Sequence, residues 1–225
     1  MKKFITLMCC VMFLTGMCGI VNSILGAKGI EFLEETSIPL PDGLTAVEYL
    51  ESTGTQYIDT GIFLNYYDVC EVKTMFFNRS SIFGTNLSDF HFNLTGTKDT
   101  TFAYYVVSSY FGQTVTSYGE EYVFRIGNGN FYIFNDLVAW RKISDSTATK
   151  TCLLFARNYN TGINDFLKGR IYWFNVIRSR NLICNMVPVR FVNELGEDEG
   201  AMYDFVSGEL FRNQGSGSFV IGPDL

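Results

Sequence analysis

The stretch with the clearest chemical pattern is residues 171–177, with the sequence IYWFNVI. Successive side chains of a strand point to opposite faces, so this pattern places Tyr172, Phe174 and Val176 on one face and Trp173 and Asn175 on the other. An asparagine in mid-strand favours a face that touches water. A flat indole beside an amide suits a sugar ring, because the indole stacks on C–H groups while the amide binds hydroxyls. Trp173 and Asn175 are therefore candidate ligand-binding residues.

Two more aromatic residues are candidates for the same role. Trp140 stands beside Arg141, and Tyr105 lies near Tyr110 in the sequence. The competing interpretation is that these rings are core or scattered surface residues, since only contiguous exposed patches are informative. A second alternating run, residues 122–126, predicts that Arg125 faces outward.

Catalytic patterns are weak in this chain. The acidic run at residues 194–199 is interrupted by Gly196 and does not place two opposed carboxylates on rigid strands, as glycoside hydrolysis requires. We interpret it as a solvated loop. The single histidine, His91, lies between Phe90 and Phe92, which predicts a structural strand position. A hydrolytic triad would need an activated nucleophile beside it, and no nucleophile-elbow motif occurs. The sequence therefore predicts a protein that is not an enzyme.

Composition favours strands and excludes one class of partner. Hydrophobic residues make up 47% of the 225 residues and aromatic residues 16%, and aromatic side chains are enriched in strands. The net charge is −6, and it becomes −8 without residues 1–23, which carry only Lys2 and Lys3. No basic stripe is visible, so nucleic acid is not an expected partner.

The elements that must position these residues are short strands joined by tight turns. We expect strands at residues 72–77, 90–94, 101–107, 122–126, 131–134, 137–141, 153–156 and 170–177. Asn128-Gly129 between two apolar runs predicts a hairpin whose turn needs positive φ at both positions. The pattern predicts an all-β fold, either a sandwich or a barrel.

Three cysteines lie outside the first 23 residues: Cys70, Cys152 and Cys184. Their odd number and spacing resemble no metal site. We expect them to be buried small apolar residues without a disulfide.

Several motifs, in order, resemble the concanavalin A-like lectin/glucanase superfamily, in a bacterial and prophage branch akin to laminin-G-like domains. They are YLESTGTQYIDTG at residues 49–61, LFARN at 154–158, GRIYWF at 169–174, VP at 187–188, MYDFVSG at 202–208 and NQGSGSF at 213–219. The resemblance covers roughly residues 45–223. It implies a two-sheet antiparallel β-sandwich, a jelly roll, whose first and last strands lie close together.

Some members of this superfamily bind calcium at the rim of the sandwich. Asp59, Asp165, Asp198 and Asp204 are the residues considered for that role, but no contiguous Asp-rich loop supports it. We predict no required cofactor, and we expect Asp59 and Asp204 to be turn residues that bind their own backbone.

The beginning of the chain has a different character. Residues 1–23 start with two lysines, continue through an apolar run and end in small residues, which is typical of a secretory signal peptide. An uncleaved membrane anchor is the alternative, and it would be the only membrane contact. Residues 24–43 are interpreted as a linker because of Pro39, Pro41 and Gly43, and residues 44–225 as the jelly-roll domain.

Together these patterns predict a secreted, periplasmic or cell-surface binding module that recognises carbohydrate or another cell-surface component. A structural or assembly module of prophage origin with protein partners is the alternative. A diverged glycoside hydrolase is a weaker one.

Overall fold

The computed structural model describes residues 39–225, except residues 87–90, 97–100, 106–109, 115 and 141–146. The predicted leader and most of the predicted linker lie outside this part of the chain. All the regular elements in the described residues are strands, which confirms the all-β prediction. No helix in that part is long and apolar enough to cross a membrane.

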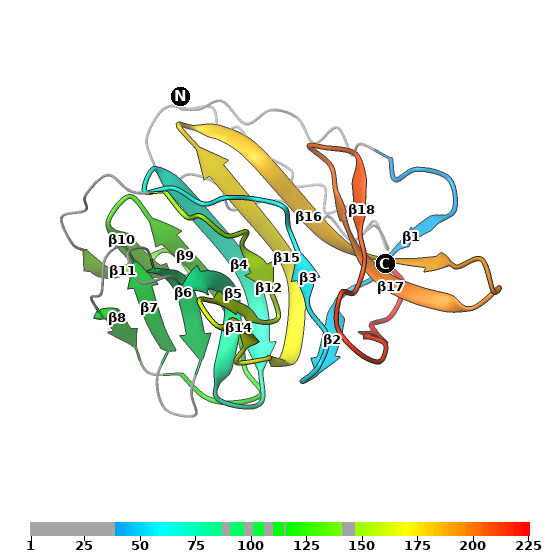
Figure 1. Cartoon of the computed structure of the whole chain (residues 1–225), viewed down its shortest axis with the longest axis horizontal. Helices are drawn as coiled ribbons and strands as arrows, with labels where there is room; N and C mark the ends of the chain where they lie inside the picture. Colours follow the sequence, from blue (N-terminus) through cyan, green and yellow to red (C-terminus); the bar gives the residue numbers. More distant parts are fainter. Residues whose placement is uncertain (1–38, 87–90, 97–100, 106–109, 115, 141–146) are drawn as a thin grey trace, which may run out of the picture.

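The strands form two sheets (Figure 1). The larger sheet has the order β11 (Asp136–Trp140), β10 (Asn130–Ile133), β9 (Glu121–Gly127), β4 (Asp68–Phe76), β15 (Lys168–Arg178), β16 (Asn181–Val192), β17 (Asp198–Asp204) and β18 (Glu209–Phe211). Three short strands complete it: β1 (Leu44–Ala46) on β16, β2 (Leu50–Thr53) on β15 and β19 (Val220–Ile221) on β2.

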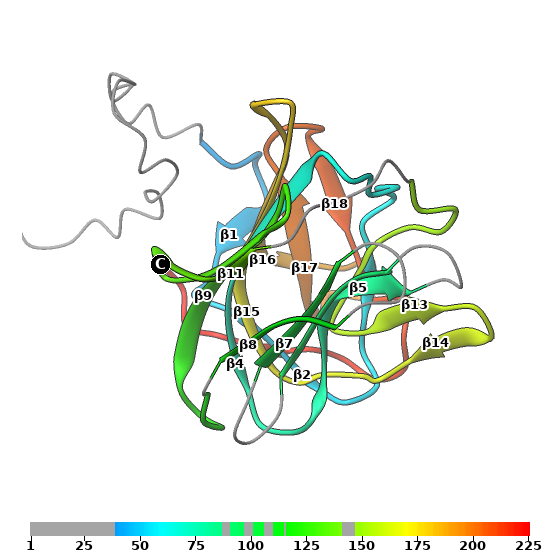
Figure 2. The same cartoon turned by 90° about the vertical axis from the view of Figure 1, so that its left-hand side faces the viewer.

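The smaller sheet has the order β14 (Gly162–Asn164), β13 (Arg157–Tyr159), β5 (Ser80–Asn86), β6 (His91–Gly96), β7 (Thr101–Tyr105) and β8 (Tyr110–Thr114). Two further strands join it: β12 (Leu153–Leu154) on β5 and β3 (Ile58–Asp59) on β12. The pairing is antiparallel except between β13 and β5, which run parallel. Figure 2 shows β9 and β4 in one layer and β5 and β13 in the other.

The main core lies between the two sheets. Phe124 and Phe174 of the larger sheet and Phe83 and Leu94 of the smaller sheet are fully buried in one cluster. The rings of Phe83 and Phe174 lie 5.3 Å apart and tie the layers together. Burying one such side chain stabilises the fold by roughly 1.5–3 kcal/mol. A second apolar cluster is formed by residues of β16 and β17 that include Val189 and Tyr203.

Each predicted strand overlaps an observed one. The prediction for residues 153–156 was too long, because Phe155 adopts the left-handed region with φ 64° and β12 ends at Leu154. The predicted hairpin at Asn128-Gly129 is confirmed, since φ is 48° and 72° at these positions and the turn joins β9 to β10. Gly127 is also required, because a Cβ there would lie 2.2 Å from the Asp68 carbonyl oxygen.

The two ends of the described chain lie side by side, as the resemblance implied. Strand β19 pairs with β2, and the buried Gln56 amide donates to the carbonyls of Ser216 and Ser218 at 3.1 and 3.2 Å. The Gly215 segment packs directly on the backbone of Thr55. The glycine- and serine-rich end is therefore fixed by close backbone contacts.

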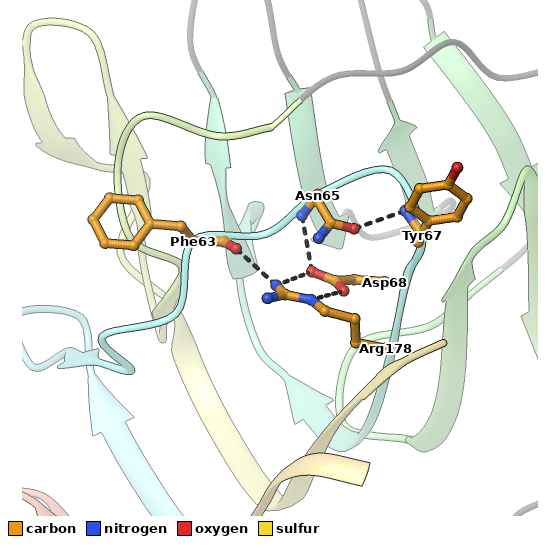
Figure 3. A network of polar contacts seen from close by, with 5 residues as sticks. All are labelled: Phe63, Asn65, Tyr67, Asp68 and Arg178. Atoms are coloured by element: carbon orange, nitrogen blue, oxygen red, sulfur yellow. Dashed lines mark hydrogen bonds and ion pairs between the residues drawn. The ribbon is translucent and has the colours of Figure 1, made fainter. Parts of the chain in front are cut away.

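The two central strands of the larger sheet, β4 and β15, are clamped at one end by an ion pair (Figure 3). Arg178 donates from Nε and Nη2 to the two carboxylate oxygens of Asp68 at 2.7 and 2.8 Å. The Asp68 carboxylate is fully buried, and it also accepts the backbone N–H of Asn65 at 2.8 Å. Arg178 donates further to the carbonyl of Phe63 at 2.9 Å, so the loop before β4 joins the clamp.

We predict that Arg178→Met lowers the free energy of unfolding by about 3 kcal/mol, because it leaves a buried carboxylate without its counter-charge. Urea unfolding measures the change. The matched control is Arg180→Met, at an exposed arginine of the adjacent turn, and it should have little effect. A loss below about 1 kcal/mol, typical of a surface pair, would contradict the prediction.

Candidate functional site

The outer face of the larger sheet, opposite the core, carries the two leading candidate residues. Phe174 and Val176 are fully buried in the core, whereas Trp173 and Asn175 are partly exposed and absent from it. This is the alternation expected for β15. Trp173 pairs with Lys73 of β4, and Asn175 pairs with Glu71 of the same strand.

The prediction was wrong for Tyr172. The register of β15 against β4 shifts between Ile171 and Trp173, so Tyr172 is the extra residue of a β-bulge. Its ring lies under the ammonium of Lys73, with the nitrogen 4.4 Å from the ring centre, and packs edge-on against Tyr49 at 5.7 Å. Tyr172 therefore belongs to the outer face rather than to the core.

The neighbours of Tyr172 form a closed charged cluster. Lys73 pairs with Glu121 at 2.7 Å, and Arg170 pairs with Glu51 at 2.6 Å. The hydrogen bond from Lys73 lowers the pKa of the Glu121 carboxyl, while burial and then the nearby Glu121 carboxylate raise the pKa of Tyr172. These charges already have partners, so this part of the face offers little to a ligand.

A second row of outward side chains crosses the sheet beside Trp173. The pairs Tyr132–Arg125, Arg125–Glu71 and Glu71–Asn175 follow one another from β10 to β15. We call Trp173, Asn175, Glu71, Arg125 and Tyr132 the outer strip. The Arg125 guanidinium lies 5.0 Å from the centre of the Tyr132 ring, and its Nε is 3.5 Å from Glu71 Oε1. Arg125 faces outward, as predicted.

Two oxygen atoms of the outer strip have unused acceptor capacity. Glu71 Oε2 and Asn175 Oδ1 are buried and accept no hydrogen bond. Burial raises the pKa of the Glu71 carboxyl, and the Arg125 guanidinium only partly offsets the rise. Glu71 and Asn175 stand directly opposite each other on β4 and β15, and an unpaired buried acceptor costs roughly 1–3 kcal/mol. A proton or a donor group shared by the two side chains would therefore satisfy both.

The other candidate residues are not brought next to Trp173 and Asn175. Trp140 is 73% exposed on the same face, opposite Asn130 of β10, so it lies near the Tyr132 end of the strip but four strands, about 19 Å at the usual strand spacing, from Trp173. Tyr105 ends β7 in the smaller sheet, and its side chain lies outside the described residues. Strand position is confirmed for His91, whose side chain is likewise outside the described part.

The aspartates considered for calcium lie in separate places. Asp59 accepts the backbone N–H two residues later, and Asp204 accepts those of Val206 and Ser207, which confirms the turn prediction. Asp165 and Asp198 each pair with an arginine. The described residues contain no group of three or more His, Cys, Asp or Glu side chains arranged for a metal.

Residues 194–197 of the acidic run lie in the exposed connection between β16 and β17, which confirms the solvated-loop interpretation there, whereas Asp198 and Glu199 begin β17. Asn193 organises it by accepting the backbone N–H groups of Leu195 and Glu197 at 2.9 and 3.0 Å.

No family model matches this chain, and no curated protein or solved structure matches it significantly. The resemblance to the concanavalin A-like superfamily therefore rests on the sequence motifs.

We predict that Glu71→Gln stabilises the protein at about pH 7.5 by about 1 kcal/mol, because the new amide supplies the donor that Asn175 Oδ1 lacks. Folding raises the Glu71 pKa, so the stability linked to its protonation is complete below the unfolded value of about 4.3 and is lost as pH rises through the folded value. The gain should therefore shrink toward about pH 4, as measured by urea unfolding.

The control for this prediction is Glu51→Gln, which removes a satisfied ion pair and should slightly destabilise the protein at about pH 7.5. Equal stability of Glu71→Gln and the unchanged protein at both pH values would contradict the prediction. It would mean that Asn175 turns its NH2 group toward an ionised Glu71.

The three cysteines provide another prediction. Cys70, Cys152 and Cys184 are free and fully buried, as expected, and burial raises the pKa of all three thiols. Since the thiolate is the reactive form, alkylation by iodoacetamide should leave them unmodified in the folded protein and modify them in urea. Peptide mass spectrometry distinguishes each site, and labelling of any one in the folded state would contradict this expectation.

Proposed function

We propose that this chain is a non-catalytic binding module that recognises carbohydrate, or another cell-surface component, through the outer strip. We also propose that its sandwich is a jelly roll of the concanavalin A-like type. The order of the sequence motifs supports this assignment, and so does the pairing of β2 with β19 near the two ends.

The observation that carries the proposal is the placement of Trp173 and Asn175 beside Arg125 on one outer face. The indole provides a flat surface for the C–H face of a sugar ring, and the amide and guanidinium provide polar groups for hydroxyls. Glu71 and Tyr132 hold the guanidinium in place from two sides. The guanidinium would thus already be in position before a ligand binds.

The carboxylates of this face support binding rather than hydrolysis. A glycosidase needs an acid and a base or nucleophile on either side of the scissile bond. Here Glu51 and Glu121 are held by Arg170 and Lys73, and the Glu71 carboxylate is buried. We propose no catalytic role and no required cofactor, and we place the protein outside the cytoplasm because residues 1–23 are typical of a leader.

The alternative, an assembly module with protein partners, is favoured by one different observation. Phe63 and Tyr67, in the loop before β4, and Leu182, near the start of β16, are 50%, 52% and 38% exposed and lie near the end of the sandwich where Arg178 is. Figure 3 shows the Phe63 ring pointing away from the ion pair that fixes its backbone. Exposed apolar side chains on a fixed backbone are suited to packing against the surface of a partner protein.

We predict that Trp173→Ala weakens binding to a glycan or envelope-polysaccharide array by at least about tenfold, which corresponds to about 1.4 kcal/mol of lost stacking. Trp140→Ala is the matched control, since Trp140 is an exposed indole on the same face but four strands from Trp173. Array binding should not change with calcium or with chelator.

Three results would contradict the proposal. Loss of binding with Trp140→Ala alone would move the site to the edge of the sheet, and loss with chelator alone would move it to a calcium rim. A blank array with folded protein would favour the assembly module, for which replacing Phe63 and Leu182 by serine should abolish the partner contact.

A further inference from the structure

A small polar pocket lies against the smaller sheet, away from the outer strip. It has a volume of about 210 Å³ and is lined by Arg79, Ser80, Thr95, Arg157 and Asp165. Arg79 comes from the turn between β4 and β5, whereas Arg157 lies on β13. The volume is below the roughly 300–1,000 Å³ of pockets for drug-sized ligands, so the pocket suits a molecule of about one sugar ring.

Arg157 is fixed in one orientation and keeps free donors. Its Nη2 pairs with Asp165 at 2.6 Å, its Nε donates to Asn164 Oδ1 at 3.2 Å, and its guanidinium lies 5.0 Å from the Tyr159 ring centre. A guanidinium has five N–H donors, so most of one edge remains unused. The Asp165 backbone is itself in the left-handed region, with φ 54°, and its carbonyl accepts the Ser81 N–H at 2.9 Å.

Arg79 differs from Arg157 because it is exposed and has no ion-pair partner in the described part of the chain. With two arginines and one aspartate, the lining carries a net charge of +1 on a chain whose net charge is −6. A local positive site on an acidic protein attracts anions and gives them two guanidinium groups to bind.

The hydroxyl groups of the pocket can accept hydrogen bonds, whereas the two arginines can only donate them. Ser80 donates its proton to Asn78 Oδ1 at 2.8 Å, and Thr95 donates its proton to Asn93 Oδ1 at 3.3 Å. Both hydroxyls are buried, and their oxygens keep lone pairs that can accept hydrogen bonds. The pocket therefore combines anion-binding donors with neutral acceptors.

We propose that this pocket binds a hydroxylated carboxylic acid, namely an acidic sugar unit whose carboxylate lies between Arg79 and Arg157. The sugar hydroxyls donate to the oxygens of Ser80 and Thr95 and to the Asp165 carboxylate. The pocket is on the other sheet from the outer strip, so this proposal stands independently of the function proposed for Trp173.

Calorimetric titration of the full protein at low ionic strength tests the proposal, with glucuronate, glucose and inorganic phosphate as probes. Glucuronate should bind at least about tenfold more tightly than glucose, and added salt should weaken it. Arg79→Gln should weaken glucuronate binding at least about tenfold. Arg180→Gln, which removes an exposed arginine elsewhere, should leave it unchanged, and so should Trp173→Ala.

Three results would overturn the proposal. If glucuronate binds no better than glucose, or if Arg79→Gln behaves like Arg180→Gln, the arginines do not recognise a carboxylate. If phosphate binds more tightly than glucuronate, the pocket recognises a phosphate instead. Loss of neutral glycan binding in Trp173→Ala, with glucuronate binding kept, would separate this site from the outer strip.

Discussion

The pairing of β4 with β15 is the constraint on which the rest of the molecule depends. Nine residue pairs define this register, and the buried Asp68–Arg178 ion pair closes it at one end. Because side chains alternate along a strand, a slip of one residue would move Phe174 out of the core and Trp173 into it. The clamp therefore contributes to the core and to the outer strip at once, although the two lie on opposite faces.

The bulge at Tyr172 divides the outer face into two chemically different parts. One part, around Tyr49 and Arg170, is closed, since its charges and rings already contact one another. The other part, the outer strip, keeps two buried acceptors unsatisfied. Natural proteins leave buried polar atoms unpaired mainly at functional or strained positions. We therefore interpret the closed part as structural and the outer strip as the candidate binding site.

Local patterns in the sequence predicted the features that depend only on neighbouring residues, namely which face a strand side chain takes and where a tight turn lies. Alternation placed Trp173 and Arg125 on the outer face, and Asn128-Gly129 fixed a hairpin. The orientation of Tyr172 was not predictable, because a bulge follows from the register of two strands distant in sequence. The pocket was not predictable either: Arg79 and Arg157 are 78 positions apart, and they line one pocket because Asp165, the ion-pair partner of Arg157, bonds to the start of β5 at Ser81.

Both proposed sites are built mainly from residues on or beside paired strands, and this affects the cost of binding. The backbone of the outer strip is held by ladder partners on both sides, and Arg125 and Arg157 are each held by a carboxylate and a ring. Ordering a side chain on binding costs about 0.5–1.5 kcal/mol, and these guanidinium groups are already ordered. A shallow face or a small pocket makes few contacts with a ligand. The avoided cost of ordering these side chains is therefore a large part of the binding free energy at either site.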